Sequence, residues 1–485
     1  MTLLSFPFLL FLSILFLLYW TLFKHSARAQ NFLLVLASML FYCLADWHFF
    51  ILLILSILFN FYLAIFIDAN KAVGKIYLLL TGLFANILIL AYFKYHDFFY
   101  HNWSQLAGVE GSVSKYDPIT IILPLGISFY TFQAIGYLVD VYNEQTKPRK
   151  SLLVFSTYMA YFPKITAGPI EPQNHFFEQI EVKREFGYNL AVEGLRQILW
   201  GMFAKLVIAD NCSFLTTQIF DNYNRLPAST LLIGAFFFLL QVYCDFSGYS
   251  NIAIGISKLF GIQLMRNFAS PFFSLDISEF WKKWNISLSS WMMKYVFYPL
   301  SFTLRKRGKP GLIISIIATF LIIGWWHGAN STFIFFGLLH GLYFIPIIVY
   351  GKINRQIVNW NGRSFPPAKD FARMIALFML VMFTIIIFGS DSIFHALGYL
   401  RNTFSDSILD MPVFPVSGSF AKAAMTLFFI LVLLSVEWIQ RDKNYELEID
   451  FIKDRRLRLA FYYAIVLSII IFGSVVHLDF IYSQF

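Results

Sequence analysis

Long apolar runs with few or no charged residues recur along the whole chain. Five of them cover residues 2–23, 46–66, 311–326, 331–350 and 459–476. Each run is long enough for a helix that spans or nearly spans a bilayer, which takes roughly 20 residues. Because no water reaches the hydrocarbon core, backbone groups must bond within the segment, so the runs are predicted to be helices rather than strands. The pattern therefore predicts an all-α polytopic membrane protein.

The composition supports this prediction. Hydrophobic residues fill 58% of the 485 positions and charged residues only 13%, whereas a water-soluble chain of this length needs more polar surface. The three cysteines, Cys43, Cys212 and Cys244, all lie in apolar stretches without metal-ligand spacing. We expect them to pack in the core, with no metal site and no disulfide framework.

The basic residues predict which loops face the cytoplasm. Lys and Arg gather around residues 24–28, 71–75, 147–150, 305–309, 352–373 and 441–458, whereas 96–118, 391–420 and 477–485 contain few. Alternating sides gives about ten to twelve crossings with both ends of the chain outside. The first run is long for a signal peptide and no basic residue precedes it, so we expect a retained span. The excess of 37 basic over 28 acidic residues then reflects orientation and affinity for anionic lipid, not nucleic-acid binding.

The sequence is interpreted as one membrane domain, residues 1–485, with three zones that differ in the kinds of residue they contain. Residues 1–115 are plain apolar helices and are predicted to be scaffold. Residues 116–345 carry Gly, Pro, Asn, Asp, Trp and His within apolar stretches, and residues 346–485 return to plain spans separated by basic loops. Polar residues at membrane depth are costly and usually face a cavity or a pathway. We therefore expect the functional site in the middle zone.

Two histidines stand in neighbouring apolar stretches. His327 closes the run 311–326, and His340 lies inside the run 331–350. Histidine can accept and return a proton near neutral pH, and Gly328 would let a thioester approach His327 closely. The alternative is an interhelical hydrogen bond that serves packing alone, and we favour that alternative for His340.

Two other segments concentrate polar side chains. Residues 280–291 are predicted to be an amphipathic interfacial helix, which accounts for the Trp and Lys residues but not for Asn285 beside a run of serines. Residues 241–251 contain seven hydrogen-bonding side chains within an apolar run. A hydrogen-bond network that fixes helix positions is the alternative to a substrate path there.

A lysine also stands between two prolines in residues 161–169. Proline frees backbone carbonyls, which a membrane tolerates only where protein or cavity water satisfies them. A broken helix that lines a cavity would leave Lys164 available to an anionic group, whereas a lysine reaching the membrane interface is the alternative. Residues 124–140 space glycine and serine along a helix, which favours close helix packing.

Together these blocks resemble the membrane-bound O-acyltransferase (MBOAT) superfamily, most closely its bacterial branch of alginate and peptidoglycan O-acetyltransferases. The likeness is carried by residues 124–142, 167–169, 245–250, 284–291 and 326–330, and by the aromatic ending 480–485. It implies a bundle of about ten to twelve transmembrane helices, with re-entrant or interfacial helices, around a central tunnel. It also implies that His327 is the essential histidine of the family.

One position departs from the branch that the sequence resembles. Most bacterial members have a histidine where Asn285 stands, and Arg-Asp where Met293 and Lys294 stand. The amide of Asn285 can donate a hydrogen bond to an oxyanion or orient His327, but it cannot shuttle a proton. We therefore expect His327 and Asn285 to be the catalytic pair, with His340 as the candidate for a second base.

The resemblance implies transfer of acetyl groups from a cytoplasmic thioester, acetyl-CoA or another acyl thioester, with no bound cofactor and no metal. His327 would take the proton of an acceptor hydroxyl that attacks the thioester. Ten further residues are expected to line the tunnel or the substrate path. They are Lys164, Tyr243, Asp245, Ser247, Tyr249, Trp281, Trp284, Ser287, Trp326 and Asn330.

The chain contains no hydrolase-like domain and no Gly-x-Ser-x-Gly elbow, so transfer to an envelope polysaccharide is expected to need a periplasmic acetyltransferase or esterase-like partner. The tail residues Phe480, Tyr482 and Phe485 would dock it. We expect a bacterial inner-membrane protein and favour peptidoglycan as the polymer, because the chain stops soon after its last span; alginate or another exopolysaccharide is the alternative. A transporter or flippase of an acyl carrier or glycolipid, and an inactive scaffold, are the rival classes.

Overall fold

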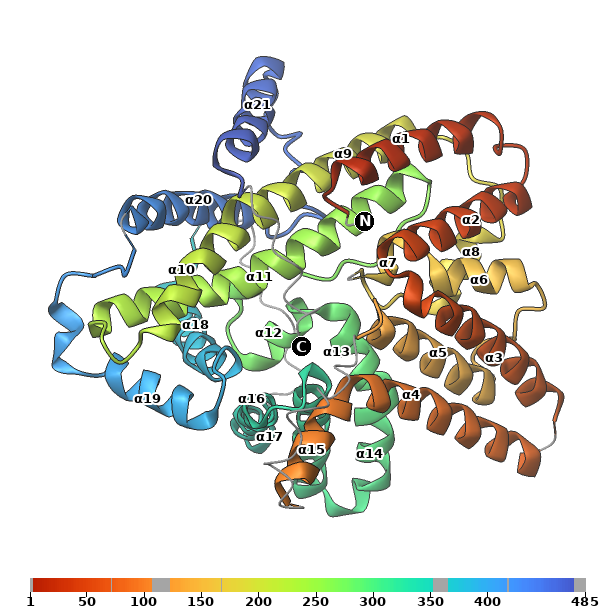
Figure 1. Cartoon of the computed structure of the whole chain (residues 1–485), viewed down its shortest axis with the longest axis horizontal. Coiled ribbons are helices and arrows are strands. Elements are labelled where there is room, and N and C mark those ends of the chain that lie inside the picture. Colours follow the sequence, from red (N-terminus) through yellow and green to blue (C-terminus); the bar gives the residue numbers. More distant parts are fainter. Residues whose placement is uncertain are drawn as a thin grey trace. The chain divides into compact units, whose positions relative to one another are not determined.

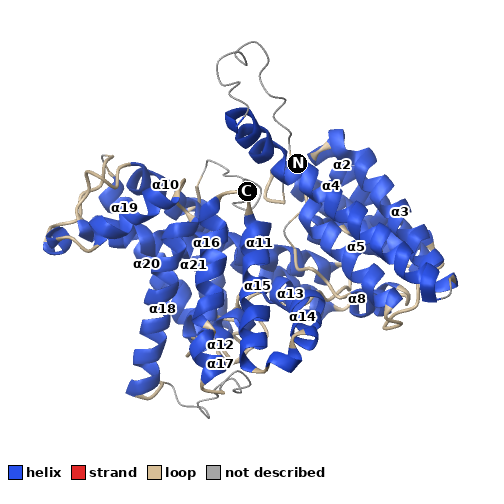
Figure 2. Ribbon diagram, turned by 90° about the horizontal axis from the view of Figure 1, so that it is seen from below, coloured by secondary structure: helices blue, strands red, loops and turns tan. Residues whose placement is uncertain are grey.

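The structure, a computed structural model, describes residues 3–70, 72–106, 123–166, 168–351, 365–416 and 418–474. Throughout these residues the regular elements are helices (Figure 2). This confirms the all-α prediction.

Nine helical segments in the described part of the chain are long and apolar enough to cross a membrane, which supports a multi-pass protein. They are Ala27–Ala45, Trp47–Ala69, Val73–His96, Tyr188–Asp221, Ala228–Leu259, Lys309–His327, Ser331–Val349, Ala368–Phe388 and Ser419–Ile439. Two predicted runs lie outside this set. Helix α1 has only 16 residues, and α21 begins with three arginines within its first four residues.

Contacts divide the chain into two compact units, and the division passes through the long helices α9 and α11. The first unit comprises Met1–Ile198 and Ile252–Met265, and the second comprises Leu199–Asn251 and Arg266–Phe485. This division follows contacts between helices, whereas the three predicted zones follow residue texture, so the zones stay a prediction.

The first unit is built from the N-terminal helices, and α3, α4 and α5 lie side by side in it (Figure 1). Its elements are α1 (Phe6–Thr21), α2 (Ala27–Ala45), η1 (Trp47–Phe49), α3 (Phe50–Ala69), α4 (Ala72–Leu106), α5 (Ile127–Tyr142), α6 (Leu152–Ala160), α7 (Phe162–Ile165), α8 (Gln173–Ile180) and most of α9 (Tyr188–Met202), with the end of α11 (Ala228–Leu259).

The second unit holds the rest of α9 and α11 and all later helices. Its elements are the π-helical turn η3 (Phe203–Ala209), α10 (Asp210–Asp221), η4 (Pro271–Phe273), α12 (Ile277–Lys283), α13 (Ile286–Met292), the π-helical turn η5 (Met293–Phe297), α14 (Tyr298–Thr303), η6 (Arg305–Arg307), α15 (Lys309–His327), α16 (Ser331–Tyr343), α17 (Ile345–Val349), α18 (Ala368–Phe388), α19 (Ile393–Thr403), η7 (Asp406–Leu409), α20 (Ser419–Ile439) and α21 (Arg455–Phe472).

A buried arginine fastens the first two helices to the segment after α8. The Arg184 guanidinium donates from Nε to Tyr19 Oη at 2.5 Å and from Nη2 to Asn31 Oδ1 at 2.8 Å. The backbone of Arg184 exchanges two further hydrogen bonds, each 2.9 Å, with the Gln30 side chain. These bonds fix α1 and α2 within the first unit.

We expect Arg184→Met to lower the free energy of unfolding by about 2–3 kcal/mol, because it leaves the Tyr19 hydroxyl and the Asn31 amide oxygen without a charged donor in a buried place. The measurement is thermal unfolding of the purified protein in detergent. Lys183→Met is the matched control, since the Lys183 side chain is half exposed. Equal melting temperatures for the two variants would contradict the prediction.

Candidate functional site

A tight hairpin of α15 and α16 carries both candidate histidines. A Cβ at Gly324 would lie 2.3 Å from the Phe333 carbonyl oxygen, and one at Gly337 would lie 2.3 Å from the Phe320 carbonyl oxygen. Only glycine therefore allows the two backbones to approach this closely. The turn is held by Asn330, whose side-chain oxygen accepts from Thr332 N at 3.1 Å and whose Nδ2 donates to Asp391 O at 2.7 Å.

His327 is the last residue of α15 and is 4% exposed. Aromatic rings surround it: the ring centroids of Trp326, Phe388, Phe336 and Phe333 lie 4.8, 5.1, 6.3 and 6.4 Å from that of the imidazole. Such a wall excludes bulk water and strengthens any hydrogen bond that the imidazole makes. Trp326, predicted to line the substrate path, is part of this wall.

His340 is fully buried and is held by Trp281. The Trp281 Nε1–H donates to His340 Nδ1 at 3.2 Å. Because an indole nitrogen can only donate, Nδ1 must be unprotonated, and the neutral ring carries its proton on Nε2. Nε2 has no hydrogen-bond partner among the described residues. With its lone pair occupied, His340 is better suited to donate a hydrogen bond than to accept a proton.

The two histidines are neighbours through one phenylalanine. The Phe336 ring lies 6.3 Å from His327 and 4.4 Å from His340, between centroids. Trp281 in turn contacts His340 and Phe320 at 5.3 and 5.0 Å. The structure thus brings Trp281, His340 and His327 into one aromatic cluster.

Asn285 breaks the amphipathic segment 280–291, which the sequence pattern had predicted to be a single helix. Its backbone is left-handed, with φ 43° and ψ 57°, and separates α12 from α13. Its carbonyl accepts from Ser289 N at 2.9 Å, whereas its side chain makes no capping hydrogen bond. Asn, Asp and His are the non-glycine residues that tolerate this conformation best. The position therefore suits both asparagine and the histidine that the family resemblance led us to expect.

Asn267, which the sequence analysis missed, positions the start of α13. Its carbonyl accepts from Ile286 N at 2.8 Å, and its Oδ1 accepts from Ser287 N at 3.1 Å. Its Nδ2 donates to Ser250 Oγ at 3.0 Å. Asn267 thereby ties the Asn285 turn to α11. Ser287, predicted to line the substrate path, is buried at this junction.

Two substitutions of Asn285 separate the role of its left-handed backbone from the role of its side-chain amide. We expect Asn285→Ala to lose about 1–2 kcal/mol of stability, because alanine is strained in the left-handed conformation. Asn285→Gly relieves that strain while also removing the amide. If the amide serves catalysis, the glycine variant keeps the wild-type melting temperature but catalyses its reaction more slowly. Wild-type activity in the glycine variant would show that only the backbone turn matters.

Tyr243 and Trp284 belong to an aromatic cluster of the second unit. The Tyr243 ring lies 4.8 Å from Phe272 and 5.7 Å from Trp284, and Trp284 stacks on Phe280 at 5.3 Å. The Tyr243 hydroxyl donates to Glu437 Oε1 at 2.7 Å. Glu437 was missed, although an acidic residue inside an apolar run signals a functional or structural partner.

Asp245 joins a buried ion cluster. Lys205 Nζ lies 2.5 Å from Asp245 Oδ1 and 2.9 Å from Asp210 Oδ1, and all three side chains are buried. Lys205 stands on the π-helical turn η3, a distortion that recurs at functional sites. The Tyr249 ring lies 5.8 Å from Lys205 Nζ. Ser247 is buried on α11, the helix that also carries Asp245 and Tyr249. These contacts favour the network interpretation of residues 241–251.

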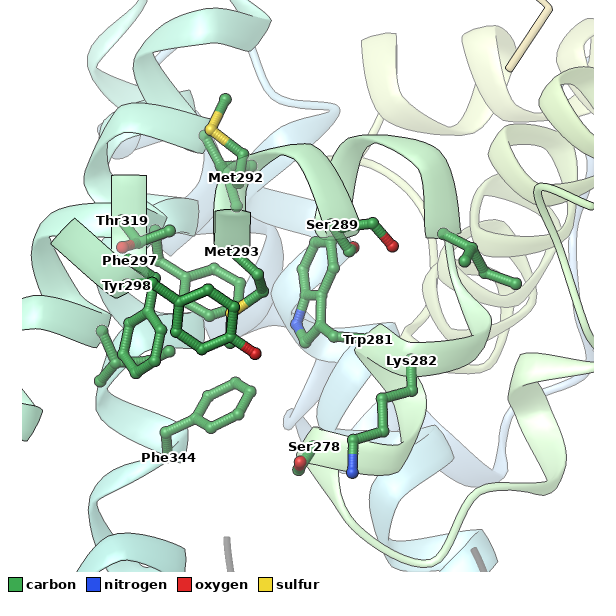
Figure 3. A pocket seen from close by; sticks show the side chains of 15 residues that line it. Ser278, Trp281, Lys282, Ser289, Met292, Met293, Phe297, Tyr298, Thr319 and Phe344 are labelled. Carbon is green, nitrogen blue, oxygen red and sulfur yellow. The ribbon is translucent and has the colours of Figure 1, made fainter. Parts of the chain in front are cut away.

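A cavity of about 560 Å³ lies beside the Trp281–His340 cluster within the second unit (Figure 3). Its wall is mostly apolar, with hydroxyl groups and one lysine. The lining residues are Ser278, Trp281, Lys282, Ile286, Ser289, Ser290, Met292, Met293, Phe297, Tyr298, Ile316, Thr319, Phe320, Ile323 and Phe344. In Figure 3, Trp281 and Lys282 face Met293, Tyr298 and Phe344 across the space.

The cavity adjoins all three candidate catalytic residues without including them in its wall. Trp281 is the hydrogen-bond donor to His340, Ile286 directly follows Asn285, and Ile323 lies one helical turn before His327. Its size and character suit a small amphiphilic ligand.

The remaining predicted residues are placed as follows. Lys164 belongs to the first unit and is fully buried. Phe480, Tyr482 and Phe485 lie outside the described residues. Across the described part of the chain, no group of three or more His, Cys, Asp or Glu side chains could hold a metal ion.

Known proteins match this chain over most of its length. The family model of the membrane-bound O-acyltransferases (MBOAT) matches residues 143–390. The probable alginate O-acetylase AlgI of Pseudomonas syringae pv. tomato is 32% identical over 373 residues, which cover 76% of this chain and 69% of that protein.

The names of two other relatives refer to different polymers. A peptidoglycan O-acetyltransferase of Helicobacter pylori is 35% identical over 338 residues, covering 64% of this chain and 62% of the relative. A teichoic acid D-alanyltransferase of Bacillus subtilis is 28% identical over 290 residues, covering 57% and 71%. With the candidate histidines inside the matched region, this chain belongs to the membrane-bound O-acyltransferase family and is a multi-pass membrane O-acyltransferase.

Proposed function

We propose that the protein resides in a bacterial inner membrane and moves acetyl groups from a cytoplasmic thioester, acetyl-CoA, to an acceptor hydroxyl on the outer side. The observation that carries the proposal is His327, buried in an aromatic wall one helical turn from the lining of a 560 Å³ cavity. The names of the relatives, which include O-acetylases of two envelope polysaccharides, support acetyl as the transferred group.

The proposed reaction uses His327 as the only base. Its imidazole takes the proton of the acceptor hydroxyl while the hydroxyl oxygen attacks the thioester carbonyl carbon. The tetrahedral intermediate then expels the thiolate, which receives the proton from His327, so no net proton is consumed. Two hydrogen-bond donors are available for the oxyanion: the amide of Asn285 and the Nε2–H of His340.

The cavity is proposed to hold the arm that carries the thioester. Its apolar wall of methionine, phenylalanine and isoleucine suits an alkyl chain, while Ser289, Ser290 and Thr319 can bond to amide groups of the arm. A path from this cavity past His327 to the outer side would form the tunnel that the family resemblance implies.

Filling the cavity should therefore block transfer. We expect Ser289→Phe to lower kcat/KM for the thioester by about 10-fold or more, because loss of cavity contacts worth 1.4 kcal/mol already changes binding tenfold. Ser301→Phe on α14 is the control, since Ser301 does not line the cavity. Rates are measured with labelled thioester on purified protein. Equal rates for both variants would remove the cavity from the donor path.

The final acceptor is proposed to be an envelope polysaccharide reached through a periplasmic acetyltransferase or esterase-like partner, which would dock on Phe480, Tyr482 and Phe485. Peptidoglycan is favoured, with alginate or another exopolysaccharide second; relatives of both kinds match this chain. In this proposal both ends of the chain lie in the periplasm.

The test reconstitutes the protein in liposomes with labelled acetyl thioester on the cytoplasmic side, without and then with a periplasmic partner. Label should become ester-linked outside only when a partner is present. Uptake of intact thioester without covalent transfer would support the transporter instead. Absence of both uptake and transfer, with the partner present, would support the inactive scaffold.

A further inference from the structure

The first unit contains a group of buried polar side chains without hydrogen-bond partners. Among the described residues, the Tyr130 hydroxyl, both amide atoms of Gln133 and the Lys164 ammonium make no hydrogen bond. All three side chains are at most 2% exposed. A buried polar group left unpaired costs about 1–3 kcal/mol, and such groups are rare in folded proteins. Three such side chains on two helices of one unit, α5 and α7, call for a common explanation.

One face of α5 presents two of these side chains. Gly126, Tyr130, Gln133 and Tyr137 follow at spacings of four, three and four residues and so share a helix face. The Gly126 end of this face meets α7, because an added Cβ at Gly126 would lie only 2.0 Å from the Ile165 carbonyl oxygen. At the other end, the Tyr137 ring lies 6.5 Å from the Tyr158 ring of α6. Tyr130 and Gln133 lie between these two ends, on the face that meets the α6–α7 segment carrying Lys164. The Tyr130 hydroxyl also lies within electrostatic reach of Asp46.

Lys164 is held by aromatic rings that use none of its N–H groups. Its Nζ lies 4.1 Å from the Tyr158 ring centroid and 4.3 Å from that of Phe176. Ring faces attract the charge but leave three donors to be satisfied. Burial lowers the pKa of Lys164 to about 7, so a neighbouring anion would help to keep the amine charged.

The acidic residue near Lys164 is already engaged. Glu171 Oε1 contacts His175 Nδ1, and Glu171 Oε2 accepts from Met265 N at 2.8 Å. The carboxylate is thus committed to holding α8 and the end of the first unit. Glu171 favours the charged ammonium of Lys164 through space but accepts no hydrogen bond from it, which leaves the Lys164 N–H groups free to donate to a ligand.

We infer that Tyr130, Gln133 and Lys164 form a binding site for an oxyanion group, a phosphate or a carboxylate. An ammonium, a phenol hydroxyl and an amide N–H are all donors, and charge-assisted bonds from such donors to oxyanions are among the strongest in proteins. The Gln133 oxygen can accept from a protonated oxygen of the same group. The oxyanion comes either from a free ion or from a lipid headgroup. None of these three residues has a role in the proposed acetyl-transfer step, although the sequence pattern predicted that Lys164 lines the substrate path.

The first experiment follows thermal unfolding of the full-length protein in detergent, with inorganic phosphate titrated against chloride at equal ionic strength. A ligand that binds only the folded state raises its melting temperature. We expect a saturable rise for the wild type that is lost in Lys164→Gln and in Gln133→Leu. It should persist in Lys75→Gln, the matched control, because Lys75 is paired with Glu144 at 2.8 Å. His327→Gln should also keep it, so failure of this site and failure of the catalytic proposal are distinguishable.

The second experiment separates the two sources of the oxyanion. The same variants are melted in nanodiscs of phosphatidylglycerol and of phosphatidylcholine. A headgroup site predicts that phosphatidylglycerol stabilises the wild type and Lys75→Gln but neither site variant, and that free phosphate has no effect. No stabilisation in either experiment, or equal stabilisation of Lys164→Gln and the wild type, would overturn the inference.

Melting temperatures measured without ligand test whether these residues have a purely structural role. If the polar atoms await a ligand, Gln133→Leu removes an unpaired amide and should not lower the melting temperature in phosphate-free detergent. A fall in both Gln133→Leu and Lys164→Gln without ligand, beyond that of Lys75→Gln, would assign these residues to the fold and would also overturn the inference.

Discussion

Replacing His327 with glutamine should reduce the proposed acetyl transfer by about 10²–10⁴-fold, the usual contribution of a positioned general base. Glutamine keeps a polar side chain of similar length in the aromatic wall of Phe333, Phe336 and Phe388, but it cannot take a proton. The loss should appear in kcat with little change in KM, because His327 lies one turn beyond the cavity lining rather than within it. Ester-linked acetate on the envelope polymer and transfer from labelled thioester both measure it.

The control is His48→Gln, since the His48 side chain is 56% exposed and stands on η1 in the first unit. Melting temperatures and membrane levels of both variants should match the wild type. Wild-type acetate in cells that express only His327→Gln would refute the proposed base. It would also return attention to the transporter and the scaffold, neither of which needs a proton acceptor at this position.

Hydropathy located the principal helices because membrane burial imposes a signal that is local in sequence. The run 311–326 corresponds to α15, Lys309–His327, and the run 46–66 to Trp47–Ala69. Where charge or proline intervenes, the signal weakens. The segment 280–291 was predicted to be one helix, whereas Asn285 turns the backbone into the left-handed region and starts a new helix. Nothing in the apolar pattern encodes that turn.

The candidate site could be predicted only in part from the sequence. His327 could be singled out because a histidine at the end of an apolar run is costly without a purpose. The hydrogen-bonded pairs around the site could not be predicted, because their members are distant in sequence: Trp281 and His340 are 59 positions apart, and Tyr243 and Glu437 are 194 apart. Asn267 was missed because one asparagine outside the long apolar runs carries no periodic signal. Contacts of this kind depend on how helices pack, which hydropathy does not encode.

The Trp281–His340 bond changes how the second histidine is interpreted. As a second base, His340 would have to give up the indole N–H at Nδ1 before accepting a proton there. As a donor through Nε2, it keeps that bond and adds to the Asn285 amide. An asparagine at position 285 and a donor at position 340 are consistent with one base, His327, and two neutral hydrogen-bond donors.

Removing the cation of the buried ion cluster should strongly destabilise the protein. Lys205→Met leaves the carboxylates of Asp210 and Asp245 buried without their shared partner, now 2.9 and 2.5 Å from its ammonium. Breaking a buried pair in this way costs about 3–5 kcal/mol. Thermal unfolding in detergent measures the loss. Lys258→Met is the matched control, because the Lys258–Glu193 pair is partly exposed and such pairs contribute about 1 kcal/mol or less.

Neutralising the whole cluster separates structure from function. The triple variant Lys205→Met, Asp210→Asn, Asp245→Asn removes every formal charge, so it should recover most of the stability that Lys205→Met loses. If Asp245 serves only the hydrogen-bond network, acetyl transfer per folded molecule recovers as well. If Asp245 lines the substrate path, stability returns while transfer stays low. A triple variant as unstable as Lys205→Met would contradict the view that the unpaired buried charges cause the loss of stability.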